Sequence, residues 1–203
     1  MPDRPGALGL VASRIGAVDG DIAGIDVLER GEDVVVDEFA VELANHELVE
    51  LLVSEIEEVD GASVEEVRTV NAFPDPRLDA LESAEQLCTA TTVVELRQTL
   101  VDHLRTEFLA DWAALVVGDE VAAAAGSGHP APEMLSALAS GTSASPLVAG
   151  GSSGPDDLAV AMLPAHDATL LVGRTGHPFR RRERLQLLAL ARIADRAWAL
   201  LRG

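Results

Sequence analysis

Residues 3–22, DRPGALGLVASRIGAVDGDI, decide the fold of the first part of this chain. A Pro-Gly turn opens the stretch, and Leu8, Val11 and Ile15 follow at the spacing of one helical face. The first N–H groups of a helix have no partner within it. Those of residues 6–8 are therefore expected to point outward, where a carboxylate can bind. A Gly-Asp turn at residues 20–21 then leads into a strand.

Strands and a second helix continue this pattern. Alternating apolar residues predict strands over residues 21–29 and 34–43. A helix is expected over residues 45–58, capped by the asparagine at its start. A closing strand is predicted over residues 64–70, and the prolines in the segment 72–76 mark a domain boundary. This order is that of a ferredoxin-like unit without its opening strand.

The segment from Asp3 to Val70 resembles an ACT domain, a regulatory module that binds amino acids between paired copies. The resemblance rests on the Asp-Arg-Pro-Gly-Ala-Leu run and on the later Gly-Asp-Ile turn. An alternative is an ACT domain that only dimerises, in which the turn is purely structural. Where the family often has asparagine, the carboxylate of Asp21 suits an amino group and repels a carboxylate. The ligand site that the resemblance implies consists of Arg4, Pro5, Gly6, Ala7, Leu8, Asp21 and Ile22.

The first strand of the ACT pattern is the main departure in this chain. The family has a hydrophobic strand directly before the motif, at the centre of a four-stranded sheet, and here only Met1 and Pro2 precede it. Two residues are too few for a strand of usual length. The strands over residues 34–43 and 64–70 are therefore expected to have open edges. Residues encoded upstream, an inward shift of the closing strand, or a segment of a second subunit are expected to fill the gap.

From Leu78 onward helices become longer and strands shorter. The Gly118-Asp119 pair is a strong signal for a hairpin turn. The predicted elements are helices over 78–88 and 93–108, strands over 112–117 and 120–125, a short helix over 132–139, a mobile loop over 144–155, strands over 158–163 and 169–173, and a long helix over 181–201.

Residues 170–185, LLVGRTGHPFRRRERL, resemble the last strand and final helix of a GAF domain. In that family a strand ending in Arg-x-x-x-Pro-Phe leads into a helix with an acidic residue and a leucine-rich face. The resemblance extends over about residues 78–201 and implies an antiparallel sheet flanked by helices, without a particular ligand. The predicted fold class is therefore α+β, with a ferredoxin-like ACT domain over residues 1–72 and a GAF-like domain over residues 77–203.

Short motifs that mimic catalytic or metal sites lack the context that such sites need. The G-x-S-x-G match at residues 150–154 has no apolar strand before it, and prolines interrupt the glycine-rich run at residues 126–131. The His-Glu pair at residues 46–47 has no second histidine three residues on. His166, Asp167 and His177 are typical turn residues near strand ends. We expect no cofactor, no metal and no catalytic residue.

Charge and cysteine content limit the partners and the cellular location that we expect. The net charge is −19, with 19 acidic and 4 basic residues over positions 1–76, so nucleic acid and anionic membranes are not expected partners. Seven arginines lie between residues 180 and 202, where they form a solvated face or dock the acidic first domain. No apolar run reaches the length of a membrane span. A single cysteine, Cys88, favours the cytoplasm.

These features predict a non-enzymatic regulatory protein that senses an amino acid or a related small molecule through its ACT domain. Output is expected through oligomerisation or a protein partner. A homodimer is expected, with its seam on the helix over 78–88 and on Leu187, Leu190, Ala194, Trp198 and Leu201 of the last helix. The alternative is a structural or interaction protein with vestigial sensor domains that binds no ligand.

Overall fold

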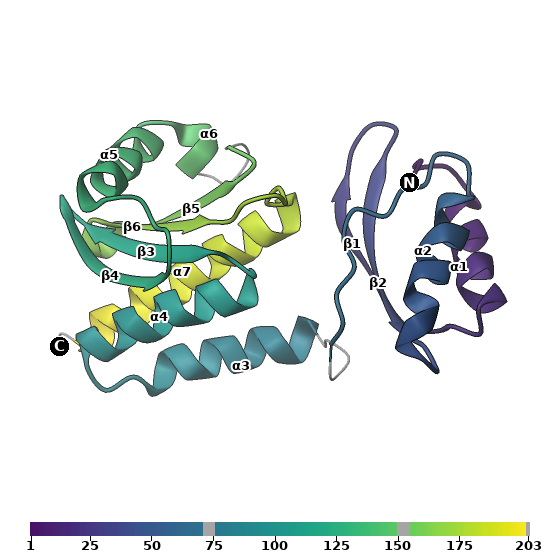
Figure 1. Cartoon of the computed structure of the whole chain (residues 1–203). Coiled ribbons are helices and arrows are strands. Elements are labelled where there is room, and N and C mark those ends of the chain that lie inside the picture. The colour runs from purple at the N-terminus through teal and green to yellow at the C-terminus, as the bar shows by residue number, and fades with distance from the viewer. Residues whose placement is uncertain (71–75, 150–154, 202–203) are drawn as a thin grey trace. The chain divides into compact units, whose positions relative to one another are not determined.

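A computed structural model describes residues 1–70, 76–149 and 155–201, and divides the chain into two compact units, Met1–Asp75 and Pro76–Gly203 (Figure 1). Each unit combines helices with an antiparallel sheet, so the α+β class is confirmed. The predicted boundary lies almost wholly outside the described residues, as does the G-x-S-x-G match at residues 150–154.

Unit 1, Met1–Asp75, consists of a β-ribbon with two helices on one of its faces (Figure 1). Apolar residues on the inner sides of the helices form its small core, which is centred on Val11, Ile15 and Val59. Arg14 also ties the two helices together, because its guanidinium lies 2.9 Å from Glu55 and 2.8 Å from Glu58. The elements of unit 1 are α1 (Ala7–Ala17), β1 (Asp21–Arg30), β2 (Val35–Glu42), η1 (His46–Leu48) and α2 (Val49–Glu57).

The closing strand expected over residues 64–70 does not form. The sheet of unit 1 has two strands, β1 and β2, and residues 62–70 have no regular secondary structure. The Arg68–Glu38 ion pair and a 3.4 Å contact from Thr69 to His46 connect this segment to the rest of the unit, and the Val64 N–H donates to the Glu57 carboxylate at 3.5 Å. The physical reason is that a strand needs a neighbour, and the central strand that would lie between the closing strand and β2 is not present.

The first residues of the chain occupy the beginning of that central position. Met1 and Val35 exchange two backbone hydrogen bonds of 2.9 Å, and the Asp3 N–H donates to Asp33 at 2.9 Å. This antiparallel pairing stops at the start of β2. Among the described residues, nothing pairs with the outer edge of β2 beyond it, so the expected inward shift of residues 64–70 is wrong.

Unit 2, Pro76–Gly203, contains a four-stranded antiparallel sheet with the strand order β4-β3-β6-β5. The predicted hairpin, the two later strands and the long last helix are confirmed. The loop predicted over residues 144–155 is wrong in part, because Pro146–Ala149 is helical. The elements are α3 (Pro76–Thr89), α4 (Val93–Glu107), β3 (Trp112–Val117), β4 (Glu120–Gly126), α5 (Pro132–Ser143), α6 (Pro146–Ala149), β5 (Leu158–Leu163), η2 (Pro164–His166), β6 (Ala168–Gly173) and α7 (Arg181–Leu201).

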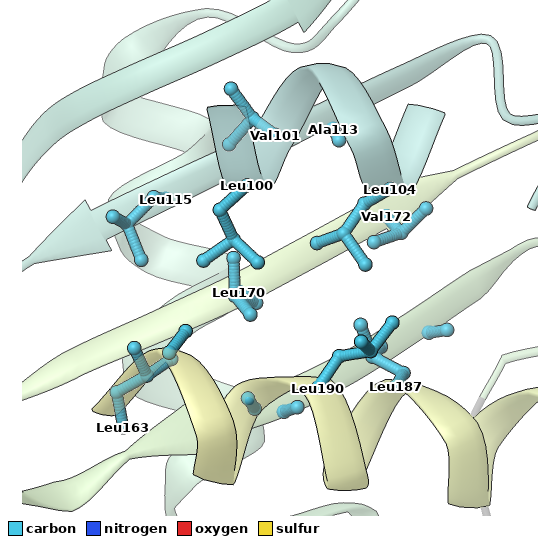
Figure 2. Close-up of a cluster of buried hydrophobic side chains, with 14 of the residues drawn as sticks. Leu100, Val101, Leu104, Ala113, Leu115, Leu163, Leu170, Val172, Leu187 and Leu190 are labelled. Atoms are coloured by element: carbon cyan, nitrogen blue, oxygen red, sulfur yellow. The ribbon is translucent and has the colours of Figure 1, made fainter. Parts of the chain in front are cut away.

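Helices cover both faces of this sheet, α3, α4 and α7 on one side and α5 and α6 on the other (Figure 1). The larger core lies under α4 and α7, where side chains from both helices meet those of β3, β5 and β6 (Figure 2). A smaller core, centred on Leu135 and Leu171, lies under α5. Because both faces are buried, the inner strands read as continuous apolar runs and not as alternating ones.

The face of α7 that was expected at a dimer seam is buried inside unit 2. Leu187, Leu190, Ala194 and Trp198 of α7 are buried within unit 2 itself, so they offer no surface to a second subunit. Cys88 on α3 is exposed, whereas its neighbour Leu87 is buried against the core. Leu81 on α3 is 68% exposed, so the seam expected on this helix stays a prediction.

A single arginine connects the end of the sheet to the helices. The Arg174 guanidinium donates to both carboxylate oxygens of Glu183 at 2.7 and 2.8 Å. It also donates to the carbonyl oxygens of Phe108 at 2.9 Å and Pro178 at 2.8 Å. Its central carbon lies 4.2 Å from the centroid of the Phe179 ring. The residues that follow β6, the start of α7 and the end of α4 thus converge on one side chain.

We predict that Arg174→Met lowers the free energy of unfolding of unit 2 by about 3 kcal/mol or more. The carbonyl groups of Phe108, His177 and Pro178 lose their donor, and the partly buried Glu183 carboxylate loses its cation and retains the Arg180 N–H. Urea unfolding followed by tryptophan fluorescence measures this, since both tryptophans, Trp112 and Trp198, belong to unit 2. The control is Arg192→Met, at an exposed position of α7, with an expected change below about 0.5 kcal/mol. Equal effects of the two substitutions would contradict the prediction.

Candidate functional site

A small cavity in unit 1 lies between the start of α1 and the β1–β2 ribbon. Its volume is about 120 Å³. This is well above the space that one water molecule needs and below the roughly 300–1,000 Å³ of drug-sized ligand sites. The cavity therefore suits a ligand of few heavy atoms. It is lined by Met1, Pro2, Asp3, Arg4, Ala7, Leu8, Ile25, Val27, Arg30, Val35 and Asp37.

Charged groups of both signs surround this cavity. The Asp3 carboxylate lies 3.3 Å from Nε of Arg30, which leaves the terminal amino groups of that guanidinium for another acceptor. Arg4 and Asp60 lie 3.7 Å apart and are 53% and 96% exposed, so water screens their attraction and the pair holds Arg4 weakly. Two carboxylates and two guanidinium groups thus line one small space with apolar walls.

Asp37 is a residue of the cavity lining whose surroundings shift the pKa of its carboxyl group. Burial raises the pKa of its carboxyl group, and the nearby Asp3 carboxylate raises it further. The Met1 amino group and Arg30 act in the opposite direction without cancelling the rise. The ionised form of Asp37 is therefore disfavoured in the folded chain, and a ligand cation beside it would relieve this.

The residues predicted for the ligand site divide into two groups. Arg4, Ala7 and Leu8 line the cavity, and Pro5 and Gly6 form the turn that leads into α1. Asp21 and Ile22 lie at the first end of β1, after α1 has ended. The α1 helix has 11 residues. At 1.5 Å per residue its two ends are about 16 Å apart, so the two groups of one chain do not meet around a small ligand.

The N–H groups expected to be free at the start of α1 are only partly so. The Ala7 N–H donates to the Arg4 carbonyl oxygen at 3.2 Å, which closes the turn. Gly6 has a φ angle of +90°, a left-handed conformation that glycine adopts without strain. No atom lies within 4 Å of the position where a Gly6 side chain would begin. A larger residue at position 6 would therefore strain the turn and not fill a ligand space.

The sequence does not predict several of the cavity residues, because their position in the cavity depends on how β1 and β2 are paired. Val27 lies directly opposite Asp37, and Arg30 lies opposite Val35. Two irregularities in β1, between Ile22 and Gly24 and between Val27 and Glu29, shift this register. The turn at residues 31–33 is the only local signal for the pairing, and it does not reveal the bulges.

Unit 2 contains a buried cluster around His166, which the sequence predicts to be a turn residue. Nδ1 of His166 lies 2.8 Å from a carboxylate oxygen of Asp195 on α7, and the His166 side chain is only 4% exposed. Its ring stacks on that of Trp198, with centroids 4.2 Å apart, and Arg97 of α4 lies 4.1 Å from the Trp198 ring centroid. The partner is Asp195, not the adjacent Asp167. The cluster fastens η2 to α7 and α4.

No group of three or more His, Cys, Asp or Glu residues within the described ranges could hold a metal ion. None of the helices described is both long and apolar enough to cross a membrane. Comparison with known proteins finds no matching family model, no matching curated protein and no matching solved structure. The geometry of the chain is therefore the basis of its functional interpretation.

We predict that Asp37→Asn stabilises unit 1 at pH 7. Because the folded-state pKa is raised, the native state binds a proton more tightly than the unfolded chain does. Ionised Asp37 thus lowers stability at neutral pH, and this effect vanishes as the pH falls through the folded value toward the unfolded one of about 3.9. Amide hydrogen exchange in β1 and β2 should be slower in the variant at pH 7 and should approach the wild-type rate below about pH 4.

The control for this measurement is Glu42→Gln, which removes an exposed carboxylate at the far end of β2. Both substitutions reduce the negative charge of unit 1 equally. Identical slowing of exchange by both would show that net charge, and not the environment of Asp37, is responsible.

Proposed function

We propose that this chain is a non-catalytic regulatory protein that binds a small amino acid in the cavity of unit 1. The observation that supports this most directly is the juxtaposition of Asp37 and Asp3 with Arg4 and Arg30 around a space of about 120 Å³. An amino acid zwitterion carries the two complementary charges a short distance apart. A guanidinium fork binds its carboxylate, and a carboxylate accepts hydrogen bonds from its ammonium group.

The apolar part of the cavity limits the side chain of the ligand. Leu8, Ile25 and Val27 supply its walls, and each of the three is partly exposed when no ligand covers it. A short aliphatic side chain would remove such surface from water, at about 25 cal/mol per Å² of apolar area. Glycine, alanine and serine fit the available volume, and large aromatic amino acids exceed it.

The resemblance of unit 1 to ACT domains and of unit 2 to GAF domains supports a sensing role. In this interpretation Asp21 and Ile22 contribute to a ligand site from a second copy, because within one chain they lie too far from the cavity. Output then leaves through oligomerisation or a protein partner. The competing interpretation is a structural protein whose sensor folds bind nothing.

Isothermal titration calorimetry of the full chain with glycine, L-alanine, L-serine and L-phenylalanine tests the proposal. We expect saturable binding of at least one of the three small amino acids. Phenylalanine is too large for this cavity, so any binding of phenylalanine should be unchanged in Asp37→Asn. The same substitution should weaken the binding of the small amino acid about tenfold or more, since a charge-assisted hydrogen bond to the ammonium group is lost. Glu42→Gln, which changes the net charge equally, should bind as wild type does.

Two results would argue against an amino acid sensor. One is the absence of binding of all three small amino acids at millimolar concentration, which favours the structural alternative. The other is binding that Asp37→Asn and Glu42→Gln alter equally, which would place the ligand away from this cavity. Sedimentation of the chain with and without the bound amino acid then shows whether ligand binding changes the oligomeric state.

A further inference from the structure

A second, larger cavity lies in unit 2, at the end of the sheet where α4 ends and β3 begins. Its volume is about 410 Å³, within the range of small-molecule sites. Trp112, the first residue of β3, forms one wall. In the sheet register Trp112 lies between two glycines, Gly126 at the end of β4 and Gly173 at the end of β6.

Both glycines are required by the side chains around this cavity. A Cβ atom on Gly173 would lie 2.3 Å from the Trp112 ring, so the indole lies directly against the backbone of β6. Gly126 has a φ angle of +87°, and a Cβ atom there would lie 2.1 Å from the Asp111 carbonyl oxygen and 2.9 Å from Cδ of Arg105. The positions of Trp112 and Arg105 at this end of the sheet are thus fixed by the absence of two side chains.

The polar groups that line the cavity have hydrogen-bonding capacity left for a ligand. Asp111 accepts a 2.8 Å hydrogen bond from the Thr175 N–H through Oδ2, which leaves Oδ1 available. The Arg105 guanidinium makes no ion pair or hydrogen bond with any described residue, in a chain with 34 acidic and 15 basic residues. The Ser127 hydroxyl, also in the lining, has no partner among the described residues either.

We propose that this cavity binds a small carboxylate that also carries an amino or hydroxyl donor, that is, an α-amino or α-hydroxy acid with an apolar side chain. The Arg105 fork binds the carboxylate with two parallel hydrogen bonds. Oδ1 of Asp111 accepts from the amino or hydroxyl group. The Trp112 ring contacts the apolar side chain. The proposal is independent of the one for unit 1, since it involves other residues and a larger ligand.

Tryptophan fluorescence isolates this site, because unit 1 contains no tryptophan. Trp112 lines the cavity, whereas Trp198 is enclosed between Arg97 and His166 and gives a constant background. The full chain is titrated with three probes of the same shape: L-leucine, its α-hydroxy analogue, and 4-methylpentanoate, which has neither donor. We expect a saturable change with leucine or its hydroxy analogue, and affinity for 4-methylpentanoate lower by about tenfold or more.

Substitutions assign the change to the cavity. Trp112→Phe should abolish the fluorescence change. Arg105→Lys, which keeps the charge but loses the fork, should weaken binding about tenfold, and Arg105→Met should weaken it further. The control is Arg192→Met, which removes a charge from an exposed position of α7 and should leave the titration unchanged. Urea midpoints equal to wild type show that the variants are folded. If Arg105→Met does not fold, the binding measured with Arg105→Lys tests the role of this arginine.

Three results would overturn the proposal. The first is no saturable change with leucine or with its hydroxy analogue at concentrations up to about 10 mM, well above a weak dissociation constant of about 1 mM. The second is a change that persists unaltered in both Arg105 variants. The third is equal affinity for 4-methylpentanoate, which would exclude recognition by Asp111. Of leucine and its hydroxy analogue, the one that binds with higher affinity shows whether the donor on the ligand is an amino or a hydroxyl group.

Discussion

The arrangement of unit 2 depends on the hydrogen bonds of Arg174. A guanidinium group has five N–H donors, and this one makes five hydrogen bonds, to Glu183 twice and to the carbonyl oxygens of Phe108, His177 and Pro178. Those carbonyls belong to the end of α4 and to the loop between β6 and α7. Carbonyl groups in such turns have no partner in a helix or a sheet, so a single planar cation both satisfies them and fixes the directions of the two helices.

A second arginine near Phe179 completes this arrangement. Arg184 is a buried residue of α7, and its guanidinium donates to the carbonyl oxygens of Pro155 and Leu158, at the start of β5. The Phe179 ring lies 4.2 Å from Arg174 and 5.9 Å from Arg184. The chain therefore uses arginines as multidentate donors at the sheet end, where the apolar core of Figure 2 cannot satisfy backbone groups.

Much of unit 2 could be predicted from sequence because its signals are local. Gly118-Asp119 marks the hairpin, Pro178 marks the entry to α7, and leucine spacing marks the helices. The errors concern non-local facts. The strand expected over residues 64–70 has the right composition but no neighbour, and apolar spacing in α7 cannot tell a subunit seam from the core of the same unit. Asp37 and Arg30 join the candidate site only through a bulged register.

The charge of the chain bears on which ligands either cavity can take. A net charge of −19 repels anions at long range, whereas a zwitterion carries no net charge and meets no such barrier. Within a cavity the distances are short compared with the screening length of about 8 Å at physiological salt, so individual fixed charges act there and the average field does not. In unit 1, Arg4 and Arg30 line one space together with Asp3 and Asp37, and in unit 2 Arg105 lines another together with Asp111. Cavities that hold fixed charges of both signs discriminate against simple anions and simple cations alike. This is the electrostatic pattern that an amino acid requires. In unit 1 it combines Asp3 and Arg4 with Arg30 and Asp37 of the ribbon, and in unit 2 it comes from two residues close in sequence, Arg105 and Asp111.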